Sequence, residues 1–390
     1  LSGEYSTTGD VVVEDGASLT VGLGSTACIG TVESVSVKNH FSVPYGDTIQ
    51  RNESSGYSEG TVRYNTDLGT MEFFNGNEWR QFTYIVDIKN SSSTRGRGLY
   101  CGGFENPSQT NAIDFIEIST LGNAQNFGDL TVKREGCGRG TISSAIRGLS
   151  MSGWDGSATN EIDYLTIASE GNSIDFGNSS SQRGWGAGMS SSTRGLNAGG
   201  YTPATVNVID YVEIMTLGDA LDFGDLATVK ESTVGMASPT RGIIGPGMSP
   251  SFVSEIDFIT IASKGNSTIF GDMDSTRGLG AAANTVRGLF CGGKGPDQQN
   301  LNLIYLITLA STGNVTEFGN LTSGRRKPEG VSNSTRACFA GGNFEPSGRV
   351  NLIDFVTIAT TADAQDFGDL SVSREAGNSN SDSHGGLGGY

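Results

Sequence analysis

Residues 219–226 read DALDFGDL, and the Phe-Gly-Asp word inside this stretch recurs along the chain. Phe-Gly followed by Asp or Asn occurs six times, at intervals of 47 to 49 residues. The six phenylalanines are Phe127, Phe176, Phe223, Phe270, Phe318 and Phe367. A spacing this regular is typical of a repeated supersecondary unit, so the larger part of the chain consists of six copies of one unit.

Each copy carries two further fixed positions before its Phe. Thirteen residues upstream lies an Asp in five copies, and Tyr305 replaces it in the fifth. These residues are Asp114, Asp163, Asp210, Asp257 and Asp354. Another 16 to 18 residues upstream lie Arg97, Arg147, Arg194, Arg241, Arg287 and Arg336. We predict that the Arg and Asp of each copy form a buried structural pair with charge-assisted hydrogen bonds, and that Arg287 binds a carbonyl or the Tyr305 hydroxyl instead.

Each copy also has the pattern of short β-strands bounded by turn residues. An apolar run after the Arg ends in Gly-Gly, a β-branched run surrounds the Asp, and a turn precedes the Phe-Gly strand. The middle run is apolar at nearly every position, as in strands that are covered on both faces. One such unit cannot bury both faces alone, whereas a ring of sheets can. The sequence therefore predicts an all-β chain in which residues 86–390 form a six-bladed β-propeller.

The unit resembles a divergent kelch repeat, because Gly-Gly closes its second strand and aromatic residues stand in its third and fourth strands. The Gly-Gly has changed to Ser152-Gly153 and Pro246-Gly247 in two copies. The resemblance implies a fold and says little about function. Residues 371–390 match the segment that leads into each Arg-Gly strand. We predict that this tail supplies the outer first strand of the first copy's sheet and closes the ring.

Residues 1–85 do not share the repeat and predict a separate β-rich region. The stretch VVVEDGASLTVGLG, residues 11–24, has a strand-turn-strand pattern. Residues 60–82 predict a series of hairpins with turns at residues 67–69 and 75–77. We expect one buried apolar face in these hairpins, formed by Val62, Tyr64, Met71, Phe73 and Trp79.

The hairpin stretch is similar to a module of tail-fibre and other virion appendage proteins of tailed phages. The matching residues are Gly60, Thr61, Val62, Arg63, Tyr64, Asn65, Thr66, Glu72, Phe73, Asn75, Gly76 and Trp79. Residues 383–387, Ser-His-Gly-Gly-Leu, resemble the ends of repeat-bearing structural proteins of marine phages. The resemblance implies attachment to a virion and a homo-oligomer, with a trimer suspected.

The composition argues against several kinds of partner. The chain has 25 Lys and Arg against 42 Asp and Glu, a formal charge of -17, which repels nucleic acid and anionic lipid. No apolar run reaches the roughly 18 to 20 residues of a membrane span, so we expect no membrane insertion. The five Cys are widely spaced without a CxxC motif, and we predict that they are small buried residues. With only two His, we expect no metal site and no cofactor.

Two short phosphate-binding motifs match the sequence, but without the residues that normally accompany them. Asp222-Phe223-Gly224 is the tripeptide that holds magnesium in protein kinases, but no other kinase motif accompanies it. Residues 288–294 fit the GxxxxGK spacing, yet Gly295 stands where Ser or Thr would bind magnesium. Both words belong to the repeat.

The loops between Gly-Gly and the Asp strand vary most between copies. In an antiparallel four-stranded blade they emerge on one face, where variable loops on a rigid scaffold often bind ligands. Aromatic side chains beside Asn, Asp and Gln suit sugar rings. The candidate ligand-binding residues are Phe104, Trp154, Asp155, Tyr201, Asp297 and Phe344. The alternative is that these loops are unconstrained and bind nothing.

Together these features predict a non-catalytic external appendage of a tailed-phage virion. Residues 1–85 would dock to other virion proteins, and the propeller loops would contact host cell-surface glycan. Two alternatives stay open. The chain is a capsid or neck decoration that binds only virion proteins, or it is a carbohydrate-active enzyme, which would need two carboxylates facing each other across a pocket.

Overall fold

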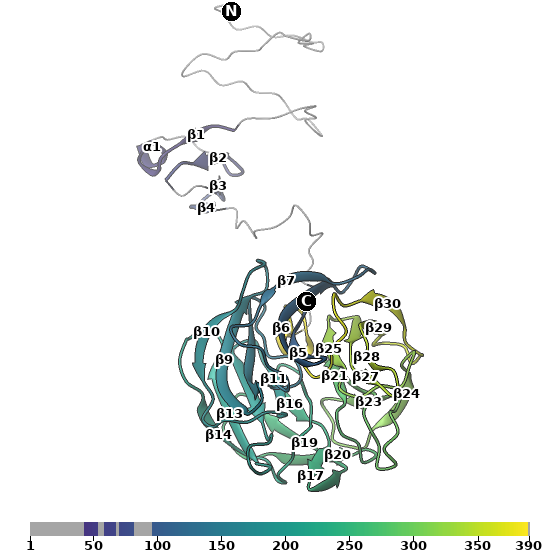
Figure 1. The fold of residues 1–390 in the computed structure, drawn as a ribbon. Coiled ribbons are helices and arrows are strands. Elements are labelled where there is room, and N and C mark those ends of the chain that lie inside the picture. Colours follow the sequence, from purple (N-terminus) through teal and green to yellow (C-terminus); the bar gives the residue numbers. More distant parts are fainter. Residues whose placement is uncertain (1–42, 54–57, 68–69, 82–95, 389–390) are drawn as a thin grey trace, which may run out of the picture. The chain divides into compact units, whose positions relative to one another are not determined.

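The computed structural model describes residues 43–53, 58–67, 70–81 and 96–388. The chain divides into two compact units, Leu1–Ile88 and Lys89–Tyr390. The boundary predicted at residues 85 and 86 and the strands predicted within residues 11–24 lie outside the described residues. Among the described helices, none is both long and apolar enough to cross a membrane. Both units are built mainly from β-strands, which confirms the all-β class (Figure 1).

The first unit contains one four-stranded sheet. It consists of β1 (Tyr45–Gly46), β2 (Val62–Asn65), β3 (Thr70–Phe74) and β4 (Trp79–Gln81) in sequence order, with α1 (Thr48–Glu53) between the first two strands. The pairs β2 with β3 and β3 with β4 are antiparallel, which confirms the predicted hairpins. The turn at Gly76 has a φ of 92°, where glycine is favoured, and the Asn75 side chain accepts the backbone N–H groups of Asn77 and Glu78.

The buried face of this sheet is polar, so the predicted apolar face was wrong. Trp79 is paired with Phe74 and therefore does not share the face of Tyr64 and Phe73. Tyr64 is 38% exposed, and Val62, Met71 and Phe73 on the same face are only partly buried. On the opposite face, Arg63, Asn65 and Glu72 are buried. Glu72 pairs with Arg51 of α1 at 2.9 Å and accepts a hydrogen bond from Asn65 at 3.0 Å. Because period-2 alternation marks two faces without saying which one is covered, the pattern could not reveal that α1 contacts the polar one.

The second unit contains six sheets that follow the six sequence repeats, as far as residues 96–388 show. The strands of the first three sheets are β31 (Asn378–Ser381), β5 (Arg97–Glu105), β6 (Ser108–Glu117) and β7 (Gln125–Asp129); β8 (Arg147–Trp154), β9 (Ala158–Thr166) and β10 (Ile174–Asn178); and β11 (Ala187–Ser190), β12 (Arg194–Ala198), β13 (Val208–Glu213) and β14 (Leu221–Asp225).

The remaining sheets consist of β15 (Gly235–Ala237), β16 (Arg241–Ile244), β19 (Glu255–Thr260) and β20 (Thr268–Asp272); β21 (Gly280–Ala283), β22 (Arg287–Cys291), β23 (Leu303–Thr308) and β24 (Thr316–Asn320); and β25 (Glu329–Ser332), β26 (Arg336–Ala340), β29 (Leu352–Thr357) and β30 (Gln365–Asp369). Two small hairpins, β17 (Gly247–Ser249) with β18 (Ser251–Val253) and β27 (Asn343–Phe344) with β28 (Gly348–Arg349), extend from loops. In the second sheet, residues 141–143 make only single bridges where the other sheets have a first strand.

The Phe-Gly-Asp word marks the contact between neighbouring repeats. Phe223 is 2% exposed and packs edge-on against Tyr211, with ring centroids 5.9 Å apart. Its carbonyl accepts the N–H of Gly265 from the turn of the following repeat at 2.9 Å. Gly224 has a φ of 150°, and a Cβ there would collide with the Gly265 carbonyl. Glycine is therefore required because the next repeat approaches the backbone closely.

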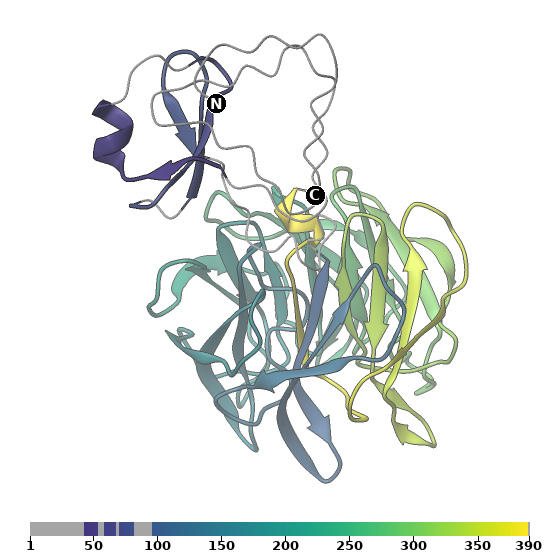
Figure 2. The ribbon, with the colours of Figure 1, turned by 90° about the horizontal axis from the view of Figure 1, so that it is seen from above.

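The tail residues pair with the first sheet, as predicted. Strand β31 is antiparallel to β5, with Asn378 opposite Cys101 and Ser381 opposite Gly98, and Figure 2 shows this yellow segment beside the first sheet. All four residues of β31 are buried, so the strand lies on the inner side of the sheet and not on the outer side. The 3-10 helix η1 (Gly385–Leu387) follows it.

The apolar core lies between the sheets. One cluster joins Leu99 and Phe127 of the first repeat to Leu165 of the second. Another joins Tyr100 of the first repeat to Ile353 of the sixth. The four cysteines among the described residues are buried and not disulfide-bonded, as predicted, whereas Cys28 lies outside those residues. Figure 1 shows β10, β14, β24 and β30 at the periphery of this unit, with β5, β11, β21 and β25 nearer its middle.

The repeat aspartates bind basic residues other than those predicted. Each Asp pairs with a basic side chain that lies seven residues after the Phe of the preceding repeat. The buried pairs are Asp114 with Arg374 at 3.5 Å, Asp163 with Arg134 at 3.2 Å, Asp210 with Arg183 at 2.9 Å, Asp257 with Lys230 at 2.6 Å and Asp354 with Arg325 at 2.9 Å. These ion pairs link neighbouring repeats, and the first of them links the sixth repeat to the first.

The repeat arginines at the start of the second strand have a different role. In five repeats the guanidinium lies over an aromatic ring of the third strand, at 4.3 to 5.0 Å from its centroid, in Arg97, Arg147, Arg194, Arg241 and Arg336. Each of the six also donates to a backbone carbonyl of the following repeat, and Arg336 donates to Ile118 of the first. These arginines are partly exposed at the start of the second strand, where a planar guanidinium can stack and donate at once. Arg287 binds the predicted kind of acceptor, the carbonyls of Ile358 and Ala359, and not Tyr305.

Tyr305 replaces the aspartate together with a second change in the preceding repeat. Its hydroxyl donates to Asp274 at 2.9 Å, and Asp274 stands where four other repeats have a Ser or Thr that donates to the aspartate. Donor and acceptor are thus exchanged. The segment from Phe270 to Gly278 is also one residue shorter than its counterparts. Because of the shortening, Arg277 is seven residues after Phe270 but occupies the place that the eighth residue has in the other repeats. No basic residue is left at the place of the buried ion pair.

Candidate binding face

One residue in each segment that joins two repeats has a positive φ. These six residues, the inner ring, are Gly136, Trp185, Ser232, Gly278, Lys327 and Ala376, with φ between 53° and 68°. Five backbone hydrogen bonds connect them in series, from Trp185 to Gly136, Gly278 to Ser232, Lys327 to Gly278, Ala376 to Lys327 and Gly136 to Ala376. Four members are not glycine, and left-handed backbone at such residues is costly unless the surroundings impose it. The five hydrogen bonds hold the backbone in this conformation here.

The residue before each inner-ring member forms a backbone bridge to the end of a second strand or to the segment that follows it. The bridges join Glu135 to Trp154, Gly184 to Tyr201, Glu231 to Met248, Arg277 to Lys294, Arg326 to Asn343 and Glu375 to Phe104. We call these twelve residues the outer ring. The inner ring, the outer ring and the variable loops therefore belong to one face of the second unit.

The predicted ligand-binding residues have two different settings. Phe104, Trp154 and Tyr201 occupy equivalent outer-ring positions, and the rings of Trp154 and Tyr201 lie 6.2 Å apart. Phe344 follows the equivalent position by one residue. Asp155 and Asp297 are exposed, and each caps its own turn by accepting a backbone N–H two residues onward. The aromatic residues thus lie on the face, whereas the two aspartates serve local turns.

Charge is divided unevenly over this face. Carboxylates stand at three outer-ring positions, in Glu135, Glu231 and Glu375. Burial raises the pKa of Glu135 and of Glu231 above the ordinary value. Glu375 is paired with Arg349 at 2.8 Å. The fourth and fifth repeats and the segments after them supply cationic side chains to the same face, from Arg277, Lys294, Arg326 and Lys327.

The cationic sector encloses a cavity of about 120 Å³, which sequence reasoning did not identify. Its lining residues are Trp185, Ser232, Arg277, Gly278, Arg326 and Lys327. The Lys327 ammonium lies 4.1 Å from the centroid of a Trp185 ring. Burial lowers the pKa of Lys327 to about 8. One feature of the sequence could have indicated this cavity. Nine residues after the repeat Phe, Trp185 and Lys327 stand where other repeats have small residues.

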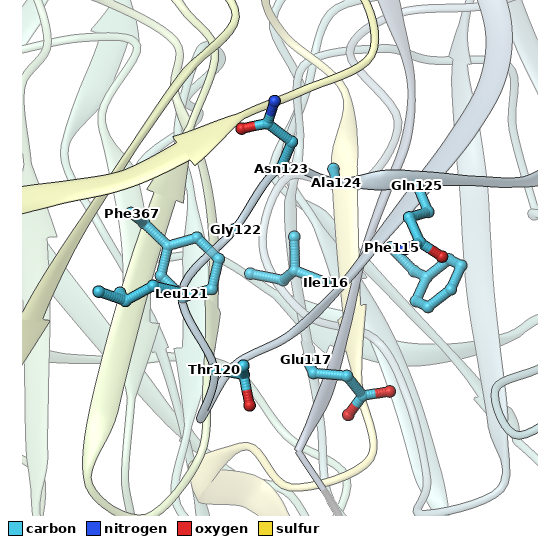
Figure 3. A pocket seen from close by; sticks show the side chains of 10 residues that line it. All are labelled: Phe115, Ile116, Glu117, Thr120, Leu121, Gly122, Asn123, Ala124, Gln125 and Phe367. Carbon is cyan, nitrogen blue, oxygen red and sulfur yellow. The ribbon is translucent and has the colours of Figure 1, made fainter. Parts of the chain in front are cut away.

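A larger, open hollow lies elsewhere on the second unit. It measures about 610 Å³ and is formed by residues 115–117 and 120–125 with Phe367 of the sixth repeat. Figure 3 shows Phe367, Ile116 and Leu121 gathered on one side of it. Its one charged lining residue, Glu117, is paired with Arg97 at 3.2 Å. Because the Gly122 N–H donates to the Phe367 carbonyl here, this hollow is a groove at the junction of the first and sixth repeats.

No candidate metal centre occurs in the described part of the chain, since no three His, Cys, Asp or Glu side chains there gather suitably. A scan against models of protein families finds no match to this chain. A search for relatives among curated proteins finds none either.

Proposed function

We propose that the second unit is a closed six-bladed β-propeller of the kelch type. Three sets of contacts support the proposal, because each runs from one repeat to the next and from the sixth back to the first, except that a hydrogen bond between Tyr305 and Asp274 replaces the ion pair between the fourth and fifth repeats. These are the buried ion pairs, the arginine-to-carbonyl hydrogen bonds and the backbone contacts at the Phe-Gly turns. The pairing of β31 with β5 would join the two ends of the ring by main-chain hydrogen bonds.

The chain itself we propose to be an external, non-catalytic appendage of a tailed-phage virion. The supporting observation is the hairpin module at residues 60–79, whose β2, β3 and β4 strands carry the residues of the phage appendage resemblance. The first unit would bind other virion proteins and form a homo-oligomer. A trimer is the state that the resemblance to tail fibres suggests.

The outward face of the propeller would contact host cell-surface glycan. Phe104, Trp154 and Tyr201 stand at equivalent positions on this face, beside the cavity-bearing sector. Aromatic side chains cover the apolar faces of sugar rings, and the neighbouring polar groups bind their hydroxyls. We propose binding without hydrolysis because Glu375, the most buried carboxylate of the face, is held by Arg349 and Asn343.

Glycan-array and host-cell binding by the full chain tests this function. We expect Trp154→Ala to weaken binding at least about tenfold, as for a central aromatic contact. The matched control is Tyr45→Ala, which removes an exposed aromatic side chain of the first unit. Binding to virion proteins without any binding to cells or glycans would favour a decoration protein, and release of reducing sugar from bound glycan would favour an enzyme.

A further inference from the structure

The cavity of the cationic sector is basic although the chain as a whole is acidic. The formal charge of the chain is -17, yet three of the six residues that line this cavity are cationic and none is a carboxylate. Arg277, Arg326 and Lys327 come from the segments that follow the fourth and fifth repeats. A local excess of positive charge in a concave site attracts anions even when the net charge of the protein is negative.

The neighbouring carboxylates neutralise these cations only in part. Arg326 lies 3.7 Å from Glu345 and 4.0 Å from Glu375, which is longer than a charge-assisted hydrogen bond of about 2.7 to 2.9 Å. Within the described part of the chain, no carboxylate lies within 4.0 Å of Lys327 or of Arg277. Arg277 instead meets the amide oxygen of Gln298 at 3.5 Å and the sulfur of Met248 at 2.8 Å, and its guanidinium lies 5.5 Å from the centroid of the Phe252 ring. The cavity therefore has cationic donors that an added anion could use.

The fold holds Lys327 in place before any ligand binds. Its backbone has a φ of 56°, donates to Gly278 and accepts from Ala376 within the inner ring. A Cβ on Gly278 would lie 3.1 Å from the Lys327 side chain, so glycine leaves room for it. The ammonium then lies over Trp185, which belongs to the segment after the second repeat. Strained backbone of this kind is often retained where it pre-organises a binding site.

The dimensions of the cavity limit what it can hold. At about 120 Å³ it has the volume of about four water molecules, each taking roughly 30 Å³. That is enough for one acidic group and the ring atoms next to it, but not for an oligosaccharide. Guanidinium groups bind carboxylate and sulfate oxygens in a two-pronged manner, and the Ser232 hydroxyl adds a neutral donor.

We propose that this cavity binds the acidic group, carboxylate or sulfate, of a sugar in the host-surface glycan. The inference depends on the proposed function, because it names the class of sugar that the loop face would recognise. The sugar ring would extend from the cavity toward the aromatic residues of the outer ring. Recognition would thus combine one charged anchor with apolar contacts.

Calorimetric titration of the full chain with three oligosaccharides of equal length tests the inference. The probes are a hexuronic acid oligomer, a sulfated hexose oligomer and the neutral hexose oligomer. We expect binding of one or both acidic probes, weakened by salt, and at least tenfold weaker binding of the neutral one. Lys327→Met and Arg277→Gln should each reduce acidic-probe affinity by about 10- to 100-fold, as expected for the loss of a hydrogen bond to a charged group.

The matched control is Lys264→Met, which also removes a cation lying over an aromatic ring, that of Tyr211, but at a distance from the cavity. This variant should bind the acidic probes like the parent chain. Thermal melting checks the fold of Lys327→Met, and Arg277→Gln, at a partly exposed position, provides a second test. Equal affinity for acidic and neutral probes, or no binding of either acidic probe, would overturn the inference. If the full chain still binds glycans on the array, the proposed function stands without this inference. If the full chain binds no glycan on the array, the proposed function and this inference are both contradicted.

Discussion

Replacing Arg183 by Met tests whether the aspartates are held by the preceding repeat. Arg183 and Asp210 are both fully buried, 2.9 Å apart, and Arg183 also donates to the carbonyl of Asn197 at 3.0 Å. The substitution would leave the Asp210 charge buried with only the Ser180 backbone and hydroxyl groups as donors. Removal of one partner of a buried pair costs about 3 to 5 kcal/mol.

The expected change in melting temperature follows from the size of the second unit. With an unfolding entropy of about 2.1 cal/mol/K per residue, roughly 300 residues give about 0.6 kcal/mol/K. The loss of 3 to 5 kcal/mol then lowers the melting temperature by about 5 to 8 °C. Scanning calorimetry and urea unfolding of the purified chain measure this shift.

Arg194→Met is the matched control, because Arg194 was the partner that spacing alone suggested. Arg194 is partly exposed, lies over Tyr211 at 5.0 Å, pairs with the exposed Glu213 at 2.8 Å and donates to the carbonyls of Ile261 and Ala262. Such contacts together contribute about 1 to 2 kcal/mol, so the shift should be about 2 to 3 °C. Adding Asp210→Leu to Arg183→Met should restore part of the loss, since no orphaned charge remains. Equal shifts for the two single variants, or no recovery in the double variant, would refute the assignment of the pairs.

Three further predictions concern the tail, the fifth repeat and pH. Removing residues 371–390 deletes β31 and the partner of Asp114, so calorimetry should show a larger fall in melting temperature than for Arg183→Met; an unchanged curve would contradict the ring closure. Tyr305→Phe removes one hydrogen bond to the exposed Asp274 and should cost only about 1 to 2 kcal/mol by urea unfolding, and a larger loss would argue against a solvated acceptor. Burial lowers the pKa of His384 from 6.5 to about 4, so its neutral form stabilises the fold above pH 6.5 and this stabilisation is lost as the pH falls toward 4. His384→Gln should flatten that part of the stability profile, and an unaltered slope between pH 6.5 and 4 would exclude His384 as its source.

Local patterns were sufficient to predict the strands of the second unit. The Phe-Gly words, the Asp strands and the Arg-Gly strands all appear where the spacing places them, because each is defined by neighbours a few residues away. The partner of the tail was also predictable, since its residues match the segment that precedes every second strand. The sequence did not show which charged residues form ion pairs.

Spacing could not identify the ion pairs because two sets of basic residues recur equally well. Arg134 precedes Asp163 by 29 residues and Arg147 precedes it by 16, and both separations are nearly constant along the chain. One internal signal did distinguish the two sets. The basic residue after Phe270 is displaced by a shortened segment in the same place where Tyr305 replaces the aspartate, while Arg287 stays. Two positions that change together are expected to be in contact. In the other repeats the basic residue seven positions after the Phe does contact the aspartate of the next repeat.

The cavity was harder to predict than the strands because its lining residues are spread over four connecting segments. Trp185, Arg277 and Lys327 are each at least 50 residues apart in sequence and differ in type, so no repeat motif contains them all. These side chains come together because the inner-ring residues have left-handed backbone. Trp and Lys rarely adopt that conformation, so their presence in the sequence does not predict it. In the first unit, likewise, the buried polar face depends on α1, whose short segment carries no strong helix pattern.

The departure from the repeat also supplies one of the three cations of the candidate cavity. In the other repeats, the basic residue seven positions after the Phe is buried against an aspartate. The shortened segment after Phe270 shifts Arg277 from that core position to the outer ring, where it lines the cavity. Tyr305 and Asp274 then satisfy each other in place of the lost ion pair. The displaced Arg277 thus joins Arg326 and Lys327 of the next connecting segment, and the three together make this sector cationic.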